Sequence, residues 1–150
     1  MFVDKIESGR QPIILCVDDE PDGLYLRRLI LERSGYRVIA ATHPARALDM
    51  MEEQCVDVAV IDYQMPQMNG AVLSAHMKRK TPRLKVIMLS GASNIPQEGL
   101  GSVDCFVSKG DGMPRVLKII SGFLAQGGNS FGQEDCFKNK RPIIDRQKNI

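Results

Sequence analysis

The sequence has no basic stripe, no CxxC pair and no apolar run long enough to span a bilayer. Its formal net charge is +2, and residues 1–125 hold 15 lysines and arginines against 15 acidic residues. A domain that binds nucleic acid normally concentrates basic residues on one surface. The balance of charge in the part that is expected to fold therefore predicts that neither DNA nor RNA is the main ligand.

The cysteines and the first residues indicate where the protein works. Four cysteines are widely spaced, at positions 16, 55, 105 and 136, and three of them lie in or beside apolar runs. This pattern is typical of buried thiols in a reducing compartment. The first ten residues contain four charged side chains and lack the apolar stretch of a secretory signal. We expect a cytoplasmic protein without membrane insertion.

Length and composition predict one globular domain. The 150 residues are 43% hydrophobic and 25% charged, which is ordinary for a single domain with a buried core. Residues 1–10 are expected to form an N-terminal extension and residues 11–125 the folded domain. Residues 126–150, which begin with glycines and polar side chains, are expected to form a polar, flexible tail.

Short apolar runs alternate with longer amphipathic stretches, which is typical of βαβ units around a parallel sheet. The runs cover residues 13–17, 36–40, 56–61, 86–89 and 105–108. Because they are almost continuously hydrophobic, we expect five strands covered by helices on both faces.

The stretches between the strands predict helices over residues 21–34, 44–53, 69–80 and 114–125. In the first helix Leu26, Leu29 and Ile30 are expected to face the sheet, and in the third Val72, Leu73 and Met77. Residues 91–104 contain three glycines and a proline where a further helix would be expected. A short or mobile helix is predicted there.

Polar side chains follow four of the predicted strands. Asp18 and Asp19 come after the first, Asp62 after the third, Ser90 after the fourth and Lys109 after the fifth. In an open parallel sheet the carboxyl ends of the strands meet at one edge, where ligands bind. We therefore expect these groups to share one pocket.

Three carboxylates in one pocket repel one another unless a cation lies between them. Mg²⁺ prefers oxygen ligands, so the sequence predicts a magnesium site that leaves Asp62 able to attack phosphorus. Lys109 would neutralise charge on the transferring oxygens, and Ser90 would donate to one of them afterwards. The chain would catalyse only its own phosphorylation and dephosphorylation, and it would not be an enzyme in the usual sense.

Simpler interpretations exist for parts of this pattern. Asp18 and Asp19 precede Pro21, so alone they fit a helix cap equally well, and Asn69-Gly70 fits an ordinary turn. Neither His43 nor His76 has a cysteine or histidine partner at the spacing of a zinc site. Phosphate-binding glycine motifs are missing as well.

The motifs at these strand ends resemble the receiver domains of bacterial two-component response regulators, over roughly residues 11–125. The resemblance is carried by ILCVDDE at residues 14–20, IDYQMPQMNG at 61–70, VIMLS at 86–90 and FVSK at 106–109. It implies an α/β fold with a doubly wound five-stranded parallel sheet of order 2-1-3-4-5, the flavodoxin-like receiver fold, with a short or irregular fourth helix.

The resemblance also implies roles for individual residues. Asp18, Asp19, Asp62 and the main-chain carbonyl of Gln64 would bind Mg²⁺. The phosphoryl donor would be a phosphohistidine on a sensor histidine kinase or a phosphotransfer protein. Ser90 and Phe106 would act as switch residues that relay the change to an unknown downstream protein. The chain would be a stand-alone response regulator.

One departure from the family pattern leaves alternatives open. The family usually has proline after the lysine, whereas Gly110 follows Lys109 here. A cis bond costs about 2.5–4 kcal/mol without proline, so glycine favours a trans bond. With the unusual fourth helix, this departure motivates an alternative, a docking module that works without phosphorylation. A metal-dependent phosphatase is a third reading, which Gln64 disfavours because that position lacks a second acid.

Overall fold

The computed structural model describes residues 10–91 and 100–126, and these residues form a five-stranded parallel sheet. The order of the strands is β2-β1-β3-β4-β5, which confirms the predicted topology. The strands are β1 (Ile13–Val17), β2 (Arg37–Ala41), β3 (Val58–Asp62), β4 (Lys85–Ser90) and β5 (Cys105–Ser108). Their bounds differ from the predicted runs by two residues at most.

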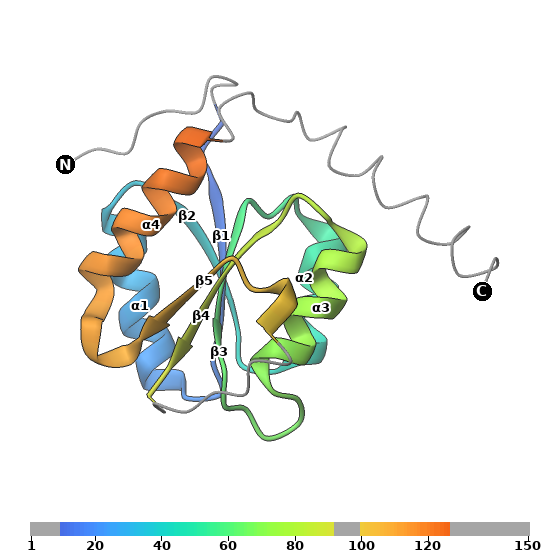
Figure 1. Cartoon of the computed structure of the whole chain (residues 1–150). Helices are drawn as coiled ribbons and strands as arrows, with labels where there is room; N and C mark the ends of the chain where they lie inside the picture. Colours follow the sequence, from blue (N-terminus) through green and yellow to red (C-terminus); the bar gives the residue numbers. More distant parts are fainter. Residues whose placement is uncertain (1–9, 92–99, 127–150) are drawn as a thin grey trace.

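Helices cover both faces of this sheet (Figure 1). In the described ranges the α-helices are α1 (Pro21–Arg33), α2 (Pro44–Glu53), α3 (Gly70–Lys80) and α4 (Gly112–Gln126). Two short 3₁₀ helices, η1 (Leu100–Ser102) and η2 (Lys109–Asp111), flank β5. Helices α1 and α4 lie on one face and α2 and α3 on the other, as the sheet's double winding requires (Figure 1).

The strands are buried on both faces because their side chains alternate between two apolar layers. All five residues of β1 are buried. Leu15 packs in the cluster that contains Ala47 and Met51 of α2, whereas Ile14 packs in the cluster with Leu31 of α1. The strands are thus almost continuously hydrophobic because both of their faces are buried, as predicted.

Two of the predicted inward residues, one in α1 and one in α3, are exposed, whereas Leu73 and Met77 of α3 are buried as predicted. Leu26 of α1 is 56% exposed and Val72 of α3 is 45% exposed, so the expectation that they face the sheet is wrong. In α1 the fully sheltered positions are instead Leu24 and Leu31. Leucine and isoleucine occur on more than one side of this helix, so periodicity alone does not choose between the possible inward faces.

Other expectations fall partly outside the described residues. Of residues 91–104, the described part contains η1, which agrees with a short helix, and residues 92–99 lie outside. The predicted tail, residues 126–150, also lies outside except for Gln126, which ends α4. Cys16 and Cys105 are free thiols, but Cys55 is disulfide-bonded, which corrects the expectation of thiols at that position. Among the described helices, none combines the length and apolar character needed to cross a membrane.

Candidate functional site

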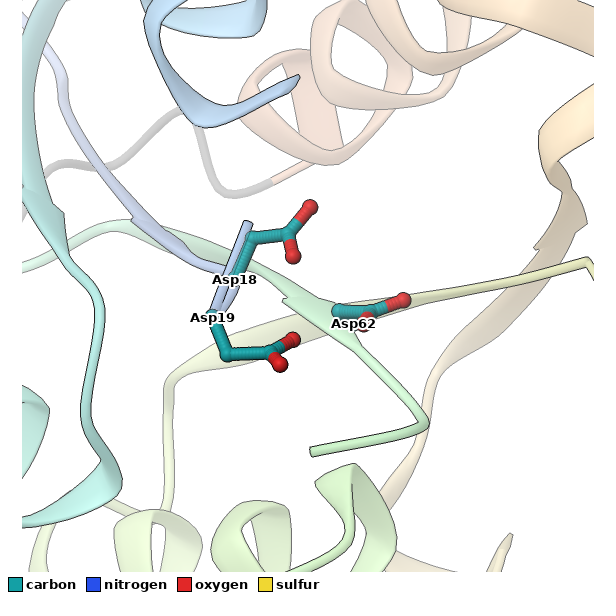
Figure 2. A group of neighbouring side chains, drawn as sticks. All are labelled: Asp18, Asp19 and Asp62. Carbon is teal, nitrogen blue, oxygen red and sulfur yellow. The ribbon is translucent and has the colours of Figure 1, made fainter. Parts of the chain in front are cut away.

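Three aspartates converge at the carboxyl ends of β1 and β3. These two strands are neighbours, and Val17 lies opposite Ile61 in the ladder, so the residues that follow emerge side by side. One carboxylate oxygen from each of Asp18, Asp19 and Asp62 lies within 4.8 Å of the others. Figure 2 shows the three carboxylates gathered at this edge of the sheet. The structure thus brings together the three acids that the sequence predicted to share a pocket.

Burial makes this concentration of negative charge costly. Asp18 is 1% and Asp62 4% exposed. Burial raises the pKa of Asp62, and the charges of Asp18 and Asp19 raise it further, while the hydrogen bond and the charge of Lys109 act in the opposite direction. The donor set consists of carboxylate oxygens at a spacing that one hard cation bridges, so the residues present fit Mg²⁺.

Lys109 approaches this cluster from β5, which is separated from β3 by β4. It follows β5 and begins η2, and its Nζ lies 2.8 Å from Oδ1 of Asp62. The bond between Lys109 and Gly110 is trans, as expected for glycine. The hydroxyl of Ser108 accepts a hydrogen bond from the Gly110 N–H at 3.2 Å, which fixes the turn that carries the lysine. Lys109 therefore contacts Asp62 although glycine, not proline, follows it in the chain.

A second cation lies at the other end of the cluster. Nη1 of Arg27, on α1, lies 3.0 Å from Oδ2 of Asp18. The other Asp18 oxygen accepts the backbone N–H of Glu20 at 3.0 Å. Glu20, not Asp18, occupies the N-cap of α1, so the helix-cap interpretation of Asp18 does not apply. Nothing in the sequence distinguishes Arg27 as part of the site, because its position beside Asp18 depends on which side of α1 faces the strand end.

The loop after Asp62 is held in place by its backbone. The Tyr63 N–H donates to the Leu89 carbonyl and the Gly70 N–H donates to the Tyr63 carbonyl, both at 2.8 Å. Asn69 caps α3 by accepting from the Val72 N–H at 3.0 Å. Gln64, predicted to offer its carbonyl to the metal, lies exposed in this loop. Asn69 and Gly70 thus form a turn and a helix cap, as in the simpler interpretation, and they also hold the loop that follows Asp62.

The two predicted switch residues lie on neighbouring strands. Ser90 ends β4 and is 1% exposed, whereas Phe106 of β5 is 38% exposed. Phe106 lies opposite Met88 in the ladder, and Ser90 opposite Ser108. The structure thus places a buried hydroxyl at the end of β4 and a partly exposed ring on the neighbouring strand β5, and their roles as switch residues stay a prediction.

A cavity of about 180 Å³ adjoins the cluster between α1 and the start of α4. Its lining is mainly apolar and includes Leu26, Met113 and Val116. Arg27 and Lys109, the two cations that pair with the acids, line it as well. The cavity and the acidic cluster therefore have Arg27 and Lys109 as shared neighbours.

Comparison with known proteins agrees with this geometry. The sequence model described as the response regulator receiver domain matches residues 14–109. The chain is similar to the response regulator GtcR of Aneurinibacillus migulanus, with 36% identity over 99 residues. That match covers 64% of the chain and 40% of GtcR, so the chain spans less than half of this relative's length.

Solved structures share the fold. The response regulator TrrA of Thermotoga maritima, in complex with Mg²⁺-BeF, superposes with a TM-score of 0.72 at 24% identity, covering 76% of this chain and 100% of TrrA. TrrA in complex with the histidine kinase ThkA gives a TM-score of 0.70 at 24% identity, covering 76% of this chain and 99% of that one. At this identity the two matches establish the architecture alone.

Proposed function

Because the chain belongs to the response regulator receiver domains of two-component signalling, we propose that it accepts a phosphoryl group on Asp62 in a Mg²⁺-dependent reaction. The observation that carries the proposal is the convergence of three carboxylates and one lysine at a single sheet edge. Phosphorylation would then switch the binding of a partner protein.

In the proposed reaction a carboxylate oxygen of Asp62 attacks the phosphorus of a phosphohistidine. The bond from phosphorus to the imidazole nitrogen breaks, its electron pair stays on that nitrogen, and Asp62 becomes an acyl phosphate. Asp18, Asp19, Asp62 and the main-chain carbonyl of Gln64 would hold Mg²⁺, which when bound neutralises charge on the transferring oxygens.

Lys109 would act on both the nucleophile and the phosphoryl group. Its ammonium lies 2.8 Å from Oδ1 of Asp62 and favours the charged form of that buried carboxylate. The same ammonium is close enough to the nucleophile to contact an oxygen of an incoming phosphoryl group. Because the Lys109 side chain is about two fifths exposed, it has the freedom to move its ammonium from Asp62 to the phosphoryl oxygen.

Ser90 and Phe106 would convert the modification into a change of surface. The Ser90 hydroxyl is buried at the end of β4, next to the strand that carries Asp62. We place it as the donor to the new phosphoryl group. Phe106 would then turn inward from its half-exposed position, which would alter the surface around β5.

The phosphoryl donor in this proposal is a sensor histidine kinase or a phosphotransfer protein in the cytoplasm. Support comes from the family and from TrrA, a protein of the same fold that forms a complex with the histidine kinase ThkA. The output would be an unidentified downstream protein that distinguishes the two states of the β5 surface.

Phosphorylation by acetyl phosphate tests the proposal directly. Wild-type protein incubated with acetyl phosphate and Mg²⁺ is expected to gain one alkali-labile phosphate, measured by intact mass. Asp62→Asn should gain none, while Asp49→Asn, which changes an exposed acid of α2, should behave as wild type. If wild type stays unmodified with both acetyl phosphate and a phosphohistidine donor, the proposal is wrong.

A different outcome would favour the docking module that works without phosphorylation. That reading requires partner binding to be the same for wild type and Asp62→Ala, with no response to Mg²⁺ or to beryllofluoride. The three acids and Lys109 remain in place around the proposed metal position, and this arrangement favours the phosphorylated switch.

A further inference from the structure

Arg27 is a counter-ion of the acidic cluster that the proposed reaction does not use. We propose that Arg27 competes with the divalent cation for Asp18, so that it weakens metal binding and leaves Asp18 when the metal binds. The inference rests on the proposed function, because it takes the cluster of Asp18, Asp19 and Asp62 to be the metal site. Arg27 would then regulate metal binding at this site from α1.

The contact between Arg27 and Asp18 is close and sheltered. Nη1 and Oδ2 are 3.0 Å apart, and the side chains of Arg27 and Asp18 are 11% and 1% exposed. The second Asp18 oxygen already accepts the Glu20 N–H. Both Asp18 oxygens therefore have donors, and a cation that binds this carboxylate must share an oxygen with one of them.

Electrostatic repulsion determines which of the two donors, Arg27 or the Glu20 N–H, leaves Asp18 when the cation binds. The three carboxylates carry three negative charges, and the contacts with Lys109 and Arg27 supply two positive ones. In the absence of metal the guanidinium relieves the repulsion between the acids. Once a dication binds Asp18, the same guanidinium lies within a few ångströms of like charge, which is unfavourable in a site shielded from water. The neutral N–H of Glu20 has no such conflict.

A cavity next to Arg27 can receive its side chain when it leaves Asp18. Its side chain lines the cavity between α1 and α4, whose volume is about 180 Å³. Gly23 forms part of the same wall, and a Cβ built on it would lie 3.6 Å from both Arg27 Nη2 and Asp18 Oδ2. Gly23 itself adds no side chain to this part of the wall.

Magnesium titration of the full chain tests the competition. Isothermal titration calorimetry should show that Arg27→Met binds Mg²⁺ about fivefold or more tightly than wild type, because one positive charge beside the dication is gone. Arg27→Lys, which restores the charge, should return the affinity toward that of wild type. Arg28→Met is the matched control, since Arg28 is on the same helix but pairs with the exposed Glu32.

Side-chain NMR follows the release itself. The Arg27 Nε–Hε resonance, assigned by its disappearance in Arg27→Lys, should shift as Mg²⁺ is added, and the midpoint of this shift should match the midpoint found by calorimetry. The Arg28 resonance should not move. A stationary Arg27 resonance at saturating Mg²⁺ would show that the guanidinium stays on Asp18, and the inference would be overturned.

The outcomes separate this inference from the proposed function. Unchanged or weaker Mg²⁺ binding by folded Arg27→Met would mean that the guanidinium merely orients Asp18, and the inference fails even if wild type is phosphorylated. Tighter binding by the variant would support the inference even if Asp62 accepts no phosphate. Should Arg27→Met not fold, Arg27→Gln gives the same comparison, and no Mg²⁺ binding by any folded form overturns the inference.

Discussion

Gly70 lies against the backbone of Asp62 so closely that a Cβ built on it would stand 2.6 Å from the Asp62 carbonyl oxygen. The same Cβ would lie 2.7 Å from Sδ of Met88 and 3.0 Å from Cα of Tyr63. Met88 has a flexible side chain, but the other two contacts are backbone atoms of the strand end that carries the proposed phosphoacceptor. Glycine is therefore required where α3 meets β3.

Replacement of Gly70 by alanine should disturb both the fold and the site. Gly70→Ala is expected to lower the free energy of unfolding by about 1–3 kcal/mol, the usual cost of overpacking. Because the end of β3 must shift, phosphorylation of Asp62 by acetyl phosphate should slow by about tenfold or more. Urea unfolding and intact mass measure the two effects.

Gly122→Ala provides the control for this change. Gly122 lies in α4, where an added Cβ meets nothing within 4 Å, so alanine there should stabilise the helix by about 0.5–1 kcal/mol. Phosphorylation should be unaffected. Equal stability of Gly70→Ala and wild type would show that the backbone tolerates the extra atom and would contradict the steric argument.

The sequence indicated the acids of this site but not the residues that position them. Asp18, Asp19 and Asp62 could be identified because they directly follow buried strands of a parallel sheet, and the topology brings such ends together. Gly70 and Arg27 could not be identified in this way. Their roles depend on how α3 approaches Met88 and on which side of α1 faces the cluster, and both are set by packing between distant segments.

The inward face of α1 was predicted wrongly because it too depends on packing between distant segments. Leucines and isoleucines are distributed around this helix, so several faces satisfy the helical period equally well. Leu31 is fully buried in the cluster with Ile14, whereas Leu26 is 56% exposed and borders the cavity between α1 and α4. The strands were simpler to predict, since burial on both faces leaves no choice of side.

Loss of the Lys109 ammonium should impair the proposed reaction more than the fold. Lys109→Ala is expected to slow phosphorylation of Asp62 on the order of 100-fold, because one charged donor to the transferring oxygens is removed. Lys118→Ala, at an exposed position of α4, is the control. Rates with acetyl phosphate at saturating Mg²⁺ check the prediction, and equal rates for the two variants would exclude a role for Lys109 in the transfer.

The raised pKa of Asp62 predicts how stability depends on pH in the absence of metal. Since burial raises this pKa in the folded protein, the folded chain binds more protons than the unfolded chain once the pH exceeds the ordinary aspartate pKa of about 4. Wild type should therefore lose stability as the pH rises through the interval between the two pKa values. Asp62→Asn carries no titrating carboxyl and lacks this loss.

Urea unfolding in EDTA, at a series of pH values, measures this difference. The stability of Asp62→Asn relative to wild type should grow from acidic to neutral pH and then level off. Asp49→Asn, at an exposed position of α2, is the control for the loss of one carboxyl group. A difference that shrinks with rising pH would mean that the folded protein favours the ionised Asp62, contrary to the burial of this carboxyl.

The two free thiols should differ in reactivity because they differ in burial. Cys16 lies in β1 with no exposed surface, and burial raises the pKa of its thiol from 9.0 to about 12. Cys105, at the start of β5, is partly exposed. Only the thiolate reacts readily with iodoacetamide, so at neutral pH Cys105 should be labelled at least about tenfold faster than Cys16. Mass spectrometry of the peptides that contain each cysteine gives both rates. In concentrated guanidinium chloride the two rates should become similar, and equal rates in the native protein would show that β1 opens to solvent far more often than its burial between two helical layers allows.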